Sequence, residues 1–163
     1  ADWKIYSTLP FNGNIGLSFF SGKRITIDYP ARKLYVSTTP LPDTVLDTQG
    51  RPVIACENPP PHFPTGLFVK GIVQEKETLV YIDSGSSRSF INETLFPQWK
   101  TVTGICLGDA NFAVPALRGT RSINFQDFPV PIGLTLGSDF LKSSVITIDR
   151  TNGQNRIILL KKR

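Results

Sequence analysis

The sequence predicts an all-β fold in which many short strands close into a barrel-like lobe. Its 163 residues include 13 glycines and 13 prolines. These turn residues are spread along the chain, which suits short strands better than long helices. Hydrophobic residues make up 40% of the chain, enough to bury a core. The length allows one domain, or one domain with an appendage.

The N-terminal third predicts a hairpin followed by a connection. Residues 24–29 alternate apolar and polar side chains, as a half-buried strand does, and residues 33–36 follow after a turn at Pro30. Residues 37–65 are rich in proline, threonine and aspartate, so we expect a connection there, with one short strand at 53–55.

The rest of the chain predicts further strands and one short helix. A helix is expected to begin at Asn92, whose side chain can cap free N–H groups. Asp109 lies in a glycine-containing segment that we expect at the tip of a hairpin. Short apolar or alternating runs indicate strands at 67–69, 79–82, 112–117, 122–125, 130–136, 145–149 and 156–160.

An internal repeat links the two ends of the chain. At an offset of 121 positions, Ile-Thr-Ile-Asp occurs twice without a gap, and each copy follows a glycine and a pair of large apolar residues. A long stretch containing Asp83 precedes the second copy, whereas the counterpart of Asp83 in the first copy would precede Ala1. The repeat matches residues 16–20 with 137–141, 25–28 with 146–149 and, after two inserted residues, 33–36 with 156–159.

One segment carries a chemical motif. The apolar run 79–82 leads directly into Asp83, and small hydroxyl residues and Gly85 follow. Glycine allows a tight turn and a close backbone approach, and the hydroxyls of Ser84 and Ser86 can hydrogen bond to a carboxylate or to a neighbouring loop. The alternative is a purely structural turn, in which an aspartate bonds to its own backbone.

The motif and its surroundings resemble a known family. Asp83-Ser84-Gly85-Ser86-Ser87, followed by Leu136–Leu141 and the second Ile-Thr-Ile-Asp hairpin, is similar to one lobe of the aspartic peptidases of retropepsin and pepsin type. The resemblance implies a pseudo-barrel with a ψ-loop, in which Gly137 ends a strand that passes beneath the active-site loop. It also implies three parts, namely the tail of a preceding lobe at 1–36, a linker at 37–65 and a complete lobe at 66–163.

The resemblance also implies roles for the loop residues. Asp83 would be the catalytic aspartate, Ser84 would support the partner loop, Gly85 would line the substrate cleft and Ser86 would bind substrate. Tyr81 departs from the pattern, because a small or aliphatic residue is usual two positions before the aspartate. The implied function is endopeptidase cleavage of an extended polypeptide by water held between two aspartates.

The chain contains one such loop, whereas the reaction needs two carboxylates. We therefore expect a monomer of this chain to be inactive. The second aspartate would come from a second lobe, supplied either by an upstream segment or by a second copy of the chain. The alternative is a non-catalytic peptide-binding or structural module with the same fold.

The remaining acids and thiols suggest no other chemistry. Asp28 and Asp149 are expected at strand ends or turns, and Asp139 is expected to cap the turn after Gly137. Cys56 and Cys106 do not have the sequence spacing of a metal site. The sequence is compatible with one disulfide between them or with two free thiols. The single histidine, His62, lies in a proline-rich stretch. No metal and no cofactor are expected.

The charge pattern suggests neither nucleic-acid binding nor a membrane span. The net charge is +5, but the positive residues are scattered except at the terminal Lys161-Lys162-Arg163. No element interleaves basic and aromatic residues as nucleic-acid-binding surfaces do. No apolar run approaches the roughly 20 residues that cross a bilayer.

Overall fold

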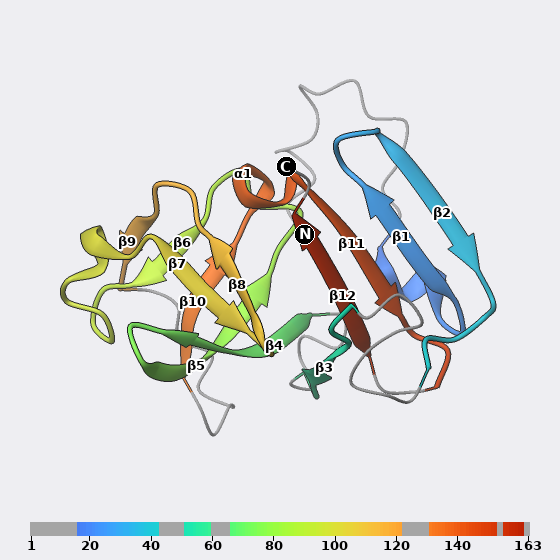
Figure 1. The fold of residues 1–163 in the computed structure, drawn as a ribbon, viewed down its shortest axis with the longest axis horizontal. Coiled ribbons are helices and arrows are strands. Elements are labelled where there is room, and N and C mark those ends of the chain that lie inside the picture. Colours follow the sequence, from blue (N-terminus) through green and yellow to red (C-terminus); the bar gives the residue numbers. More distant parts are fainter. Residues whose placement is uncertain (1–15, 43–50, 60–65, 122–130, 153–154, 162–163) are drawn as a thin grey trace.

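The computed structural model describes residues 16–42, 51–59, 66–121, 131–152 and 155–161, and these ranges form a nearly all-β structure (Figure 1). The all-β prediction is confirmed, and the sheet curls into a half-barrel. The strands are β1 Arg24–Asp28, β2 Lys33–Ser37, β3 Ile54–Glu57, β4 Leu67–Val73, β5 Lys76–Ile82, β6 Phe90–Asn92, β7 Gly104–Leu107, β8 Ala110–Ala113, β9 Arg118–Thr120, β10 Ile132–Leu136, β11 Ser144–Asp149 and β12 Arg156–Lys161. The short helical turns are η2 Leu17–Phe20, η3 Trp99–Thr101 and α1 Ser138–Leu141.

The repeated segments form the same unit twice, side by side. A helical turn precedes each hairpin, namely η2 before β1–β2 and α1 before β11–β12. The two hairpins join through antiparallel pairing of β1 with β11, in which Thr26 lies opposite Thr147. These two threonines are repeat equivalents, 121 positions apart, and their hydroxyls are hydrogen bonded at 2.9 Å. A local twofold axis therefore passes between them and relates the two copies.

The second part of the sheet curls around a buried strand. β10 runs parallel to β5 on one side and antiparallel to β6 on the other, and all five of its residues are buried. β4 pairs with β5 and also with β7, and β3 pairs with both β12 and β4. The short strand expected at 53–55 is present as β3, which begins one residue later and ends two residues later, and it joins the repeat hairpins to the curled sheet (Figure 1).

Glycine lets β10 lie this close to its neighbours. A Cβ atom at Gly133 would lie 2.3 Å from the Thr78 hydroxyl oxygen and 2.7 Å from the Phe96 ring, and the β5–β10 register is irregular at this residue. Any larger side chain would push β10 away from β5. The close packing of β10 against β5 therefore depends on glycine at position 133.

Some local expectations were wrong. No helix begins at Asn92, which ends β6, and its side-chain oxygen instead accepts the N–H groups of Thr94 and Leu95 at 3.1 and 3.3 Å. Of the strand expected at 112–117, only 112–113 is strand, as the end of β8, and neither β7 nor β9 was expected. The prediction that the Asn92 side chain accepts hydrogen bonds from backbone N–H groups was correct. These bonds close a turn rather than begin a helix, because an asparagine can do either.

Other expectations lie outside the described residues. These are the strand at 122–125, the stretch around His62 and the end of the basic tail. Within the described ranges, no helix has the length and apolar character that crossing a membrane would take.

A buried acid ties the segment after β2 to the second hairpin. Asp149 is 1% exposed, and its carboxylate accepts from the Leu41 N–H at 2.7 Å, from Thr151 and from the Arg156 guanidinium at 2.8 Å. Arg156 also donates to the Leu41 and Pro42 carbonyls. Burial acts to raise the pKa of Asp149, but the hydrogen bonds from Thr151, Leu41 and Arg156 outweigh it and hold the pKa below its ordinary value.

We expect Asp149→Asn to lower the free energy of unfolding at neutral pH by about 3 kcal/mol, because it removes the carboxylate charge that the buried Arg156 guanidinium faces at 2.8 Å. A lowered pKa stabilises the fold above the ordinary value of 3.8, and this contribution is lost as the pH falls through the folded-state pKa. Urea unfolding from pH 7 to pH 2.5 should thus show the wild type and variant converging in acid. Asp28→Asn, at the less buried repeat equivalent, is the control and should have a smaller effect.

The two cysteines are free thiols in different environments. Cys56 is 3% exposed, and burial followed by the charge of Glu57 raises its pKa to about 12. Cys106 is half-buried and donates to the Gly108 carbonyl. Because thiolates are the reactive form, the two side chains should differ in reactivity.

Under native conditions at pH 8, a thiol reagent should therefore modify Cys106 and spare Cys56, and both should react in denaturant. Mass spectrometry of the labelled protein reports the sites. Rapid native labelling of Cys56, or the absence of a second reactive thiol after denaturation, would contradict this assignment.

Candidate active site

The Asp83 loop begins where a central strand ends. In β5, Leu79, Val80 and Ile82 are buried, and the strand is flanked by β4 and β10. The Asp83 N–H donates to the Leu136 carbonyl at 3.0 Å, which extends the contact between β5 and β10 into the loop. The core, rather than a surface turn, therefore sets the position of Asp83.

The loop turns tightly after Asp83. The Gly85 N–H donates to Oδ1 of Asp83 at 2.9 Å, and the Ser86 N–H donates to the Asp83 carbonyl at 3.2 Å. The Ser86 hydroxyl donates to the Arg88 carbonyl at 2.7 Å. Asp83 and Ser86 are half-buried, whereas Ser84 and Gly85 are exposed. A structural turn would make the same contact with Oδ1, and here that contact also orients the carboxylate.

The loop lies directly on Gly137. A Cβ atom there would be 2.3 Å from the Arg88 carbonyl oxygen and 2.9 Å from that of Ser86. The next residue, Ser138, donates its N–H to the Ser86 carbonyl at 2.7 Å. The end of β10 and the start of α1 thus support the loop from beneath by backbone contact, which only glycine permits at this distance.

Ser89 and Asp139 connect the loop to α1. Ser89 is fully buried, and its hydroxyl donates to Oδ1 of Asp139 at 2.6 Å and accepts from the Gly137 N–H at 3.0 Å. The Ser89 N–H donates to Oδ2 of Asp139 at 3.0 Å. Asp139 also accepts from the Phe140 N–H, so it contacts the turn as expected. Its link to Ser89 was not expected, because the two residues are 50 positions apart.

Two tyrosines lie beside the loop. Burial raises the pKa of Tyr29, which follows β1, and the nearby Ser84 side chain opposes that shift. Tyr81 stacks on Phe68 with ring centroids 4.9 Å apart, and burial followed by the charge of Asp83 raises its pKa to about 12.

Other acids have structural roles. Asp28 accepts from the Ala31 N–H at 3.0 Å, Asp149 pairs with Arg156, and Asp139 bonds to Ser89. Asp109 lies in the turn between β7 and β8, as expected. No group of three or more His, Cys, Asp or Glu side chains that could hold a metal ion occurs within the described part of the chain.

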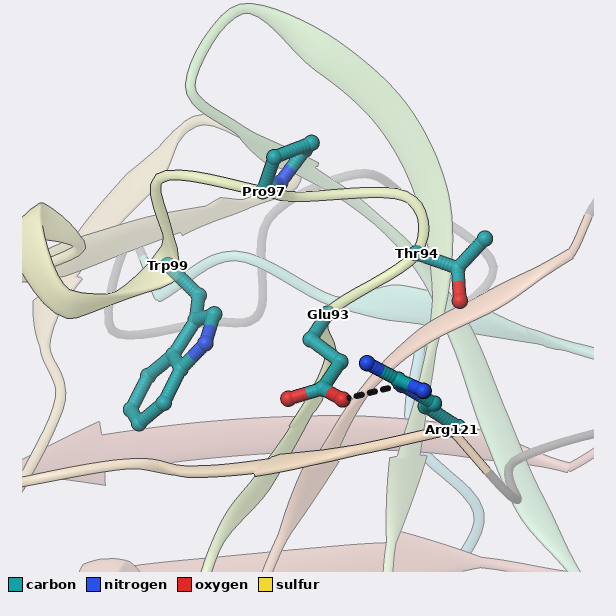
Figure 2. A pocket seen from close by; sticks show the side chains of 5 residues that line it. All are labelled: Glu93, Thr94, Pro97, Trp99 and Arg121. Carbon is teal, nitrogen blue, oxygen red and sulfur yellow. Dashed lines mark hydrogen bonds and ion pairs between the residues drawn. The ribbon is translucent and has the colours of Figure 1, made fainter.

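A separate pocket lies at the β6 and β9 end of the sheet. Figure 2 shows the Glu93 carboxylate facing the Arg121 guanidinium, with 2.7 Å between Oε1 and Nε, and Trp99 beside them. Thr94 and Pro97 complete the lining. None of these residues belongs to the Asp83 loop, and Arg121 is largely exposed. An exposed ion pair of this kind contributes little to stability.

No protein-family model matches the chain, and no curated protein matches it. Among solved structures, the chain is similar to a retropepsin-like aspartic protease from Rickettsia conorii at 13% identity. The similarity covers 70% of this chain and 94% of that one, with a TM-score of 0.39.

The contact between the loop and Gly137 can be tested with a matched pair of substitutions. Gly137→Ala should lower the free energy of unfolding by about 3 kcal/mol, because the new methyl group overlaps the Arg88 carbonyl. At the repeat equivalent, Gly16, the nearest atom to a new Cβ is 3.7 Å away. Gly16→Ala should therefore cost less than about 1 kcal/mol. Equal losses in denaturant unfolding would contradict the proposed support.

Proposed function

We propose that this chain supplies one catalytic carboxylate, Asp83, to an aspartic-type endopeptidase. The observation that supports this best is the anchoring of the loop: Asp83 leaves a buried central strand, and the loop lies against Gly137 and Ser138. Ser89 and Asp139 add a second layer of hydrogen bonds. Catalytic groups need such support to hold their geometry, whereas an ordinary surface turn does not.

The chemistry requires two adjacent carboxylates. Two such groups cannot both ionise, so they share one proton. The ionised carboxylate removes a proton from water as the water oxygen bonds to the peptide carbonyl carbon, and the protonated carboxylate donates to the carbonyl oxygen. The tetrahedral species then collapses: one of its hydroxyls returns a proton to the dyad as the C=O bond re-forms, the C–N bond breaks, and the nitrogen leaves with the proton that the dyad took from water. This proton transfer needs no metal and no cofactor.

The remaining loop residues have proposed roles around Asp83. Gly85 is exposed, so it can line a cleft in which an extended polypeptide lies and bonds through its backbone. Ser84, which is exposed, would support the partner loop, and Ser86 would contact substrate from the edge of the loop.

The second carboxylate is proposed to come from a second lobe. In this organisation, residues 1–36 are the tail of that lobe, 37–65 are a linker, and 66–163 are the lobe that carries Asp83. The support is the local twofold axis between Thr26 and Thr147, since it relates the first hairpin to the hairpin that closes the Asp83 lobe. A second copy of the chain is the other possible source.

Replacing the carboxylate tests the assignment. In the complete enzyme, assayed with its second lobe present, Asp83→Asn should reduce peptide cleavage by about 1,000-fold or more, because the amide cannot take a proton from water. The melting temperature should hardly change, since asparagine keeps the size and most hydrogen bonds. Asp109→Asn, at the exposed hairpin tip, is the control and should keep full activity.

Three outcomes would change the assignment. Full activity in Asp83→Asn would remove Asp83 from catalysis. Asp83-dependent cleavage by a strictly monomeric 1–163 chain, established by light scattering, would show that no second lobe is needed. A complete polypeptide that binds extended peptides but cleaves none between pH 3 and pH 8 would favour the non-catalytic binding module.

A further inference from the structure

The side chains beside Asp83 form a row across four strands. β5, β10, β6 and β9 are neighbours in that order (Figure 1). Tyr81 on β5 is paired with Thr135 on β10, and Thr135 is paired with Phe90 on β6. Phe90 is in turn paired with Arg118 on β9. Because paired residues of a sheet point to the same face, these four side chains share one face of the curled sheet.

The opposite face of the same strands is the core. Val80, Leu134 and Ile91 alternate with the residues of the row, and all three are 0% exposed. Asp83 follows Tyr81 by two positions, and its charge contributes to the raised pKa of Tyr81. Since successive side chains of a strand alternate between faces, the Asp83 carboxylate lies on the face of the row rather than in the core.

The row opens to solvent at its β9 end, where two arginines lie on adjacent segments. Phe90 is half-buried, whereas Arg118 is exposed. Arg88 is also exposed and lies two positions before Phe90, with the fully buried Ser89 between them. The Arg118 N–H donates to the Ser89 carbonyl at 3.1 Å. The two arginines are therefore close neighbours through one backbone hydrogen bond.

Neither of these arginines forms an ion pair with a described residue. Carboxylates on the same segments have other partners. Glu93, which follows β6, pairs with Arg121 at 2.7 Å, and Asp139 accepts from the Ser89 N–H and hydroxyl. A guanidinium can donate two parallel hydrogen bonds to one carboxylate. Two neighbouring guanidinium groups without a counter-ion therefore favour an acidic ligand.

The Arg88 backbone is fixed relative to Asp83. Its carbonyl oxygen accepts from the Ser86 hydroxyl at 2.7 Å, and a Cβ atom at Gly137 would lie 2.3 Å from that oxygen. The same loop carries the Asp83 carboxylate and the Arg88 side chain. An acidic side chain of a bound polypeptide can thus be recognised at a set distance from Asp83.

We propose that Arg88 and Arg118 select polypeptide substrates that carry an aspartate or glutamate near the cleaved bond. The inference rests on the proposed function, because it places that bond beside Asp83. Three strand spacings of about 4.8 Å separate β5 from β9, and an extended peptide rises about 3.3 Å per residue. The acidic side chain is therefore expected within about four residues of the cleaved bond.

Peptide binding to the 1–163 chain tests this selectivity without an activity assay. The probes are an uncharged, glutamine-containing peptide with blocked ends and its variants in which one glutamine at a time is replaced by glutamate. At low salt, at least one glutamate variant should bind about fivefold more tightly than the uncharged parent. The preference should shrink at about 0.5 M salt, because exposed charges are then screened.

Matched arginine variants locate the source of the preference. Arg88→Gln and Arg118→Gln should each weaken it, and the double variant should abolish it. Arg121→Gln is the control, since it removes the same charge from a side chain that is 86% exposed and paired with Glu93, and it should leave the preference intact. All these side chains are exposed, so the melting temperature should hardly change.

The remaining outcomes overturn the inference or separate it from the proposed function. No glutamate preference at any position overturns it, and so does an absence of binding at millimolar peptide. NMR shift changes at Arg88 and Arg118 with none at Asp83 also overturn it, because the acidic site would then be separate from the loop carboxylate. A preference lost in the double variant, together with full activity in Asp83→Asn, would support recognition of acidic polypeptides and count against the proposed function.

Discussion

The passage of β10 between β5 and β6 is the constraint on which the rest of the structure depends. Its five residues are fully buried, and glycines at 133 and 137 allow neighbouring chain segments to approach within distances that no Cβ would permit. Through Leu136 and Ser138, the strand and the turn after it fix both the start and the far side of the Asp83 loop. The packing of the core and the geometry of the loop therefore depend on each other, because a displacement of β10 would also move the Asp83 carboxylate.

The repeat shows how identical sequence can have different energetic roles. Asp28 and Asp149 end the same Ile-Thr-Ile-Asp segment, yet Asp149 is buried against Arg156 while Asp28 closes an exposed turn. The alternation of apolar and polar residues gives both segments the same strand backbone. The segments that pack around each copy determine how deeply its aspartate is buried. The same difference separates Phe19 from Phe140.

The candidate site was partly visible in the sequence. Asp83 and its glycine-containing loop follow a run of apolar residues, and Leu136-Gly137 occurs within the repeated unit, so local signals were sufficient to select both. Ser89 and Asp139 gave no such signal as supports of the loop. Their contact joins residues 50 positions apart in sequence, and a buried serine has no periodic pattern that distinguishes it from an exposed one.

By itself, the sequence determined the all-β class, the two hairpins and the motif, because alternation, turn residues and repetition are local properties of a chain. Only the tertiary structure decided that the hairpins pair about Thr26 and Thr147, that β3 joins the two parts of the sheet and that Ser89 bonds to Asp139. It also showed which copy of the repeat is covered. Strand partners and burial depend on contacts between distant segments, and the free energy of those contacts is set by the packed whole rather than by any one segment.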